Sequence, residues 1–96
     1  WKPMGPFIAT GLDPLALTIK VNLDGKEVSS YTTDKMIFTA QHYIAKITQY
    51  TTLWPGDVLW LGVDNATIPD LQDGMVCDVI QDDIGVLRNP VARAKA

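Results

Sequence analysis

Residues 17–23 read Leu-Thr-Ile-Lys-Val-Asn-Leu, and the pair Asp24-Gly25 follows at once. Apolar residues occupy every odd position of this stretch, and polar residues occupy every even one. A period of two is typical of a strand that buries one face. Asp-Gly is a preferred pair for a tight hairpin turn. The stretch therefore predicts a β-hairpin, with residues 26–31 as the return strand.

Further strands are predicted on both sides of this hairpin. Residues 58–63 are nearly all apolar, which indicates a central strand covered on both faces. Residues 75–81 and 84–88 predict two more strands, joined by a turn at Asp82-Asp83. The short apolar run at residues 7–10 is typical of a buried strand bounded by turn residues.

One helix is expected between these strands. Residues 39–50 carry apolar side chains at near-helical spacing, after three candidate N-cap residues at 32–34. Pro55-Gly56-Asp57 predicts the turn that follows. The chain thus reads as α+β and mostly β, with five or six strands and one main helix.

Composition narrows the classes of function. Ninety-six residues allow one domain, and a net charge of −3 argues against binding to a phosphate backbone, so no nucleic acid is expected. No apolar run approaches the roughly 20 residues of a membrane span, so no membrane association is expected either. The single Cys77 excludes an intrachain disulfide framework and fits a reducing compartment, which favours the cytoplasm.

The reactive side chains do not form a complete catalytic set by themselves. His42 is the only imidazole, and its helical neighbours offer no orienting carboxylate. Cys77 stands beside Asp78 on an apolar strand, which is typical of a buried structural thiol. The aspartates of residues 64–83 match no calcium-loop spacing and are expected in turns.

Five motifs, in order, resemble the fumarylacetoacetate hydrolase family. Residues 3–14 resemble its "PLGP" strand, and residues 22–25 its "VNGE" hairpin. Residues 36–38 match its "DMIF" motif, and residues 52–58 match "TLxPGDV". Residues 83–90 match its "GIGxLRNPV" ending. The resemblance covers residues 3 to 91.

The resemblance implies a mixed β-roll of the fumarylacetoacetate hydrolase type and a piece of an enzyme. Members act on small 2-oxo or 1,3-dioxo acids by C–C hydrolysis, decarboxylation or tautomerisation with Mg²⁺ or Mn²⁺, whose ligands are expected outside this chain. Residues 1–96 would be the C-terminal portion of the catalytic domain, completed by an N-terminal segment or a companion chain. A homodimer of the whole is expected, and the 96-residue chain alone is expected to be inactive.

The resemblance also implies which residues touch substrate. They come from two loops: Pro3, Met4 and Gly5, and Gly62, Val63, Asp64 and Asn65. Two departures stand out, because the family's usual "GT" reads Gly62-Val63 here and its Asp before Met is Lys35. Valine lacks the threonine hydroxyl. An alternative is therefore a non-catalytic binding or interaction module.

Overall fold

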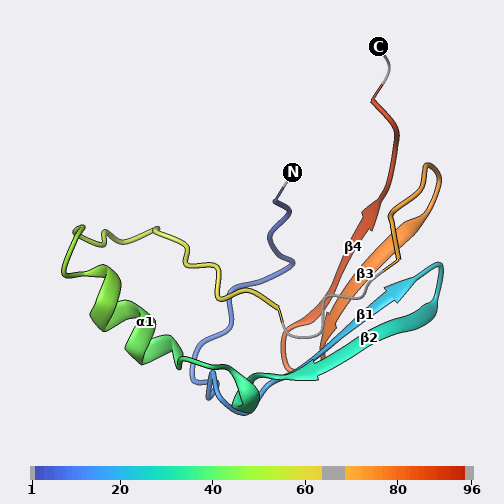
Figure 1. The fold of residues 1–96 in the computed structure, drawn as a ribbon. Helices are drawn as coiled ribbons and strands as arrows, with labels where there is room; N and C mark the ends of the chain where they lie inside the picture. The colour runs from blue at the N-terminus through green and yellow to red at the C-terminus, as the bar shows by residue number, and fades with distance from the viewer. Residues whose placement is uncertain (1, 64–68, 95–96) are drawn as a thin grey trace.

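The computed structural model describes residues 2–63 and 69–94. Its elements, in chain order, are β1 (Thr18–Leu23), β2 (Lys26–Thr32), the 3₁₀ helix η1 (Thr33–Lys35), α1 (Ala40–Ile47), β3 (Val76–Gln81) and β4 (Gly85–Pro90). The four strands form one antiparallel sheet in the order β2-β1-β3-β4 (Figure 1). The expected class, mostly β with one main helix, is confirmed.

The predicted hairpin forms one side of this sheet, with β2 at the edge and β1 between β2 and β3. Asp24 and Gly25 both have positive φ, at 50° and 80°, as the two-residue turn between twisted strands requires. The Asp24 backbone N–H donates to the Val76 carbonyl (2.9 Å), and the Val76 N–H donates to Asp24 Oδ1 (2.8 Å). The turn is therefore fastened to the start of β3.

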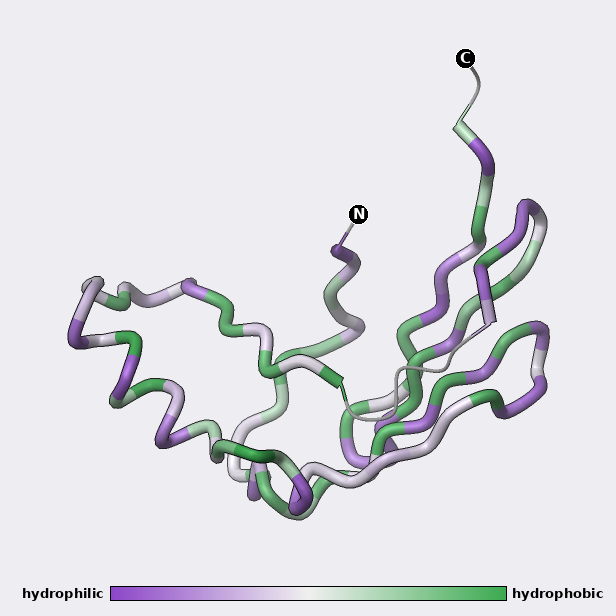
Figure 2. The backbone as a smooth tube through the Cα atoms, viewed as in Figure 1, coloured by the Kyte–Doolittle hydropathy of each residue, from purple (hydrophilic) through white to green (hydrophobic). Residues whose placement is uncertain are grey.

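The two faces of the sheet differ in chemistry, as the period of two predicts. Val21 and Leu23 are buried on one face, and Val21 pairs with Val79, which in turn pairs with Leu87. Asn22, Asp78 and Arg88 form a polar row across the other face. Figure 2 shows this alternation of apolar and polar residues along the strands.

Two of the predicted strands are wrong. Residues 7–10 and 58–63 belong to no strand, and neither segment pairs with any other described segment. Ile8 is 95% exposed and Trp60 is 52% exposed, so the expected cover on both faces of residues 58–63 is not seen. A strand needs a backbone partner, and the described residues provide one for four strands rather than five or six.

The helix starts later and ends earlier than expected. Its N-cap is Thr39, whose Oγ1 accepts the His42 N–H (3.1 Å), and not a residue of the 32–34 group. Met36 is extended (ψ 137°), which separates η1 from α1. The turn predicted at residues 55–57 is present, because the Asp57 N–H donates to the Trp54 carbonyl. Within the described part of the chain, no helix has the length and apolarity needed to cross a bilayer.

Candidate functional site

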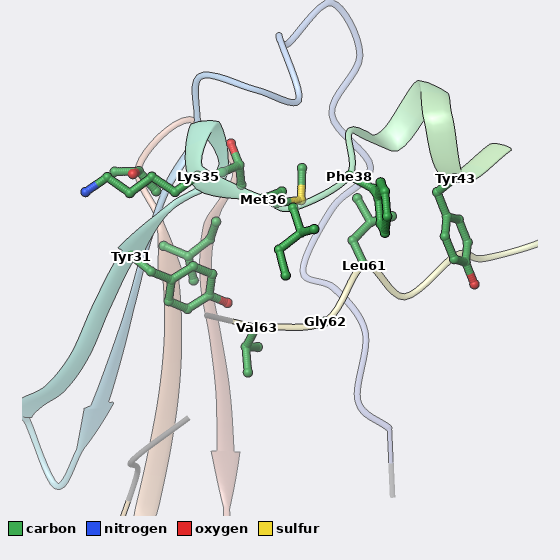
Figure 3. A pocket seen from close by; sticks show the side chains of 12 residues that line it. Tyr31, Lys35, Met36, Phe38, Tyr43, Leu61, Gly62 and Val63 are labelled. Atoms are coloured by element: carbon green, nitrogen blue, oxygen red, sulfur yellow. The ribbon is translucent and has the colours of Figure 1, made fainter. Parts of the chain in front are cut away.

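A pocket of about 430 Å³ opens where the sheet meets the helical segment (Figure 3). Its wall comes from the ends of β1 and β2, from η1 and the run that follows, from α1, and from residues 61–63. The lining residues are Ile19, Tyr31, Thr32, Thr33, Lys35, Met36, Ile37, Phe38, Tyr43, Leu61, Gly62 and Val63. Most of this wall is apolar, so it offers a bound molecule mainly nonpolar contacts.

Local hydrogen bonds hold the rim of the pocket in place. Thr33 Oγ1 accepts the Leu17 N–H (3.0 Å), and the Thr33 N–H donates to the Leu17 carbonyl (2.9 Å). The Met36 N–H closes η1 on the Thr33 carbonyl (3.4 Å). The apolar run of residues 36–38 follows this turn and lines the pocket, as Leu61 does.

The structure brings together part of the predicted substrate-binding set. Gly62 and Val63 line the pocket, and Gly62 has φ 82°, a conformation that favours glycine. Pro3, Met4 and Gly5 do not line it. Asp64 and Asn65 lie outside the described residues, as does Thr67.

The first loop instead lies near β4. A Cβ placed on Gly5 would stand 3.9 Å from Leu87 Cδ1, which is ordinary contact. The Lys2 Nζ atom lies 5.8 Å from the centre of the Trp60 ring, so the start of the chain passes beside the segment that carries Gly62 and Val63. Pro3, Met4 and Gly5 thus follow a residue that lies beside Trp60, although none of the three reaches this pocket.

The reactive side chains lie outside the pocket. The exposed His42 stacks on Phe38, with ring centroids 4.8 Å apart and planes at 12°. Cys77 is half-buried rather than fully buried, and burial, followed by the charge of Asp78, raises the pKa of its thiol. Among residues 2–63 and 69–94, no three His, Cys, Asp or Glu side chains gather as a metal site would require.

Sequence reasoning missed Tyr31 as a pocket residue. It lies on β2 opposite Ile19, and the two side chains share the face of the sheet that borders the pocket. Burial raises the pKa of the Tyr31 phenol. The weak alternation of residues 26–31 gave no signal, whereas the matched motif at residues 36–38 could have pointed to this wall.

Comparison with known proteins identifies a family model and related sequences that match most of this chain. The family model described as fumarylacetoacetate (FAA) hydrolase C-terminal matches residues 1–92. An uncharacterised protein of Archaeoglobus fulgidus is 35% identical over 93 residues, which are 97% of this chain and 37% of that protein. The mitochondrial oxaloacetate tautomerase Fahd2a of Rattus norvegicus is 38% identical over 63 residues, covering 62% of this chain and 20% of that protein.

A solved enzyme structure has a similar fold. The 5-carboxymethyl-2-hydroxymuconate delta-isomerase of Mycobacterium smegmatis superposes with a TM-score of 0.89 at 27% identity, over 96% of this chain and 36% of that one. The chain thus spans little more than a third of the length of the relatives that it matches along most of its own length.

Proposed function

This chain belongs to the fumarylacetoacetate hydrolase family, and on that premise we propose that it forms one wall of the active site of an enzyme for small 2-oxo or 1,3-dioxo acids. The observation that carries the proposal is the pocket of about 430 Å³ lined by Gly62 and Val63, the dipeptide at the position of the family's "GT". Residues 1–96 are then the C-terminal portion of a catalytic domain, which a further segment or chain completes.

Isomerisation or tautomerisation is the reaction class that the relatives favour over hydrolysis. Two of them are named as a delta-isomerase and an oxaloacetate tautomerase. Such reactions move a proton through an enol or enolate, whose negative charge needs stabilisation in a site with little water. The apolar side chains of Met36, Phe38 and Leu61 would form one wall of such a site once a further segment covers them, since Phe38 and Leu61 are 62% and 43% exposed here.

The proposed Mg²⁺ or Mn²⁺ does not fit the described pocket residues. These cations bind oxygen ligands, with carboxylates foremost, and the pocket wall offers hydroxyls and the Lys35 amine but no carboxylate. We therefore propose that the metal ligands of the enzyme lie outside this pocket wall, in the part that completes the catalytic domain, and that the wall contributes shape and hydrogen bonding.

The test uses the intact protein and oxaloacetate. Its enol form absorbs in the ultraviolet, so interconversion with the keto form is followed directly, with added Mg²⁺ and after chelation. We expect the protein to accelerate interconversion in a metal-dependent way. Val63→Thr restores the hydroxyl at the family's position and should change the rate with oxaloacetate. An intact protein that neither turns over oxaloacetate or other small oxo acids nor binds oxalate contradicts the proposal.

A non-catalytic module is the second candidate, because Val63 lacks a hydroxyl at the position of the family's Thr. It predicts that oxalate binds the intact protein while no oxo acid is turned over. A gain of turnover in Val63→Thr would then identify a decayed enzyme. Turnover of an oxo acid by the unmodified protein would support the enzyme and contradict the non-catalytic module.

Assembly and location remain proposals. We propose a homodimer of the whole protein, to be tested by sedimentation, and a location in the cytoplasm, to be tested by fractionation, whereas the Rattus norvegicus relative is named as mitochondrial. The isolated 96-residue chain is proposed to be inactive, since the described residues gather no metal site. Oxo-acid turnover by that chain alone would contradict this.

A further inference from the structure

Five polar residues line the pocket, and they differ in whether their side chains can reach a bound molecule. They are Tyr31, Thr32, Thr33, Lys35 and Tyr43. The Thr33 hydroxyl is engaged in both directions with Leu17, since it accepts the Leu17 N–H (3.0 Å) and donates to the Leu17 carbonyl (3.4 Å). Thr33 is therefore occupied by structure.

Three of the others face away. Thr32 follows Tyr31 on β2, so its side chain stands on the opposite face of the sheet. In Figure 3 the Lys35 amine points away from the apolar side chains of the wall, and the Tyr43 hydroxyl also points away from them. The Tyr31 hydroxyl, in contrast, points toward Val63 in the same view. Of the polar groups that line the described wall, Tyr31 thus faces the pocket.

We propose that the Tyr31 hydroxyl is the hydrogen-bond donor of this wall and binds a carboxylate or enolate oxygen of a small oxo acid. This inference rests on the proposed function and deepens it, because it names the residue that recognises the substrate here. The donor acts by positioning and by stabilising negative charge, and no proton leaves the phenol.

The surroundings of Tyr31 suit this role. Burial raises the pKa of the phenol, so the hydroxyl stays protonated and able to donate at neutral pH. The ring is half-buried and paired across the sheet with Ile19, which limits the positions of the hydroxyl. A hydrogen bond to a charged oxygen is stronger than one between neutral groups, and more so beside apolar side chains.

Val63 complements this arrangement. Its side chain carries no donor or acceptor, so it cannot compete with the substrate for the Tyr31 hydroxyl that points toward it. A threonine at this position could accept that hydrogen bond. With valine at position 63, the Tyr31 hydroxyl therefore stays free to donate to a bound molecule.

The test compares Tyr31→Phe with Tyr50→Phe in the intact protein. Phenylalanine keeps the ring and removes only the hydroxyl, and Tyr50 is an exposed tyrosine outside the pocket. For Tyr31→Phe we expect kcat/KM with oxaloacetate to fall roughly ten- to a hundredfold and the dissociation constant of oxalate, measured by calorimetry, to rise at least severalfold. Tyr50→Phe should leave both values within about twofold of the unmodified protein.

Folding is followed separately by the thermal midpoint, which Tyr31→Phe should shift by no more than a few degrees. The inference is overturned if Tyr31→Phe keeps both kcat/KM and oxalate affinity within about twofold, or if Tyr50→Phe loses as much. In either case the unmodified protein is active, so the proposed function survives. If the unmodified protein neither turns over oxaloacetate nor binds oxalate, the proposed function fails and this inference fails with it.

Discussion

Asp78 on β3 and Arg88 on β4 face each other in register and form a two-pronged ion pair. Arg88 Nε donates to Asp78 Oδ1 and Arg88 Nη2 donates to Asp78 Oδ2, each at 2.8 Å. The Asp78 side chain is only 8% exposed, whereas that of Arg88 is 69% exposed. The pair thus neutralises a buried carboxylate with a cation that stays in contact with water. The Oδ1 atom of Asn22, the next residue in the row, is buried without a partner among the described residues.

The first prediction concerns pH. The hydrogen bonds from Arg88, more than its charge, lower the pKa of Asp78 below its ordinary value of 3.8, although burial opposes them. A carboxyl whose pKa is lower in the folded state contributes stability that is fully present above the unfolded-state pKa and is lost as pH falls through the folded-state value. We expect the free energy of unfolding to be independent of this group above about pH 4 and to decline below it.

Asp78→Asn is the control for this prediction. The amide keeps the shape of the carboxyl but carries no charge, so it cannot titrate. The difference in unfolding free energy between the unmodified protein and Asp78→Asn, from urea titrations, should stay constant from neutral pH down to about pH 4 and then shrink. A difference that stays constant far below pH 4, or that grows, would contradict the lowered pKa.

The second prediction concerns the hairpin turn. Asp24 has φ 50° and accepts the Val76 N–H on its Oδ1 atom, so it combines a left-handed backbone with a bond to β3. Asp24→Ala loses the acceptor and places alanine in a disfavoured conformation, at a cost of about 1 to 2 kcal/mol. Asp24→Asn retains an acceptor and tolerates this backbone, so its cost should be a few tenths of a kcal/mol.

Hydrogen exchange of the Val76 amide measures this effect locally. Exchange should accelerate in Asp24→Ala and remain close to the unmodified rate in Asp24→Asn. Equal exchange rates in the two variants would mean that the carboxylate contributes nothing to the start of β3.

The sequence predicts the elements whose signal is local. The alternation at residues 17–23 specifies β1 and the face that each of its side chains occupies, and the Asp24-Gly25 turn predicts that β2 returns beside it. Residues 58–63 and 7–10 have equally apolar runs, yet they form no strand with any described segment. A strand also requires a neighbouring backbone, and apolar composition does not reveal whether a neighbour is present.

The residues of the candidate site also differ in whether the sequence could identify them. Gly62 and Val63 could be identified from their place after the turn at residues 55–57, because a motif fixes position along the chain. Tyr31 could not, because its role depends on the register of β2 against β1 and on where η1 turns the chain. The resemblance implies Pro3, Met4 and Gly5 for the same site, but they do not line the pocket, and Gly5 lies beside Leu87 of β4.

The third prediction concerns the start of α1. Thr39 Oγ1 accepts the His42 N–H at 3.1 Å, which satisfies one of the free donors of the first turn. Thr39→Ala should destabilise the helix by about 1 kcal/mol, whereas Thr39→Ser retains the acceptor and should cost much less. Exchange of the His42 amide reports the difference, and similar protection in both variants would show that the cap is unimportant.

The fourth prediction concerns the reactivity of Cys77. Burial is the larger cause and the charge of Asp78 the smaller one, and both raise the pKa of the thiol above 9.0. Only the thiolate reacts with iodoacetamide, so alkylation of the folded protein should be slow at neutral pH, with a midpoint above pH 9. Asp78→Asn removes the nearby negative charge and should move that midpoint downward, while burial keeps it above the ordinary value.

Arg88→Gln provides the opposite control for the thiol. It leaves the Asp78 charge without its cation, so the pKa of Cys77 should rise further and alkylation at pH 9 should slow. Both variants loosen the same ion pair, and a change that merely exposed Cys77 would accelerate alkylation in both. Opposite shifts in the two variants therefore identify the charge of Asp78 as the cause, whereas shifts of the same sign would attribute the reactivity to local opening of β3.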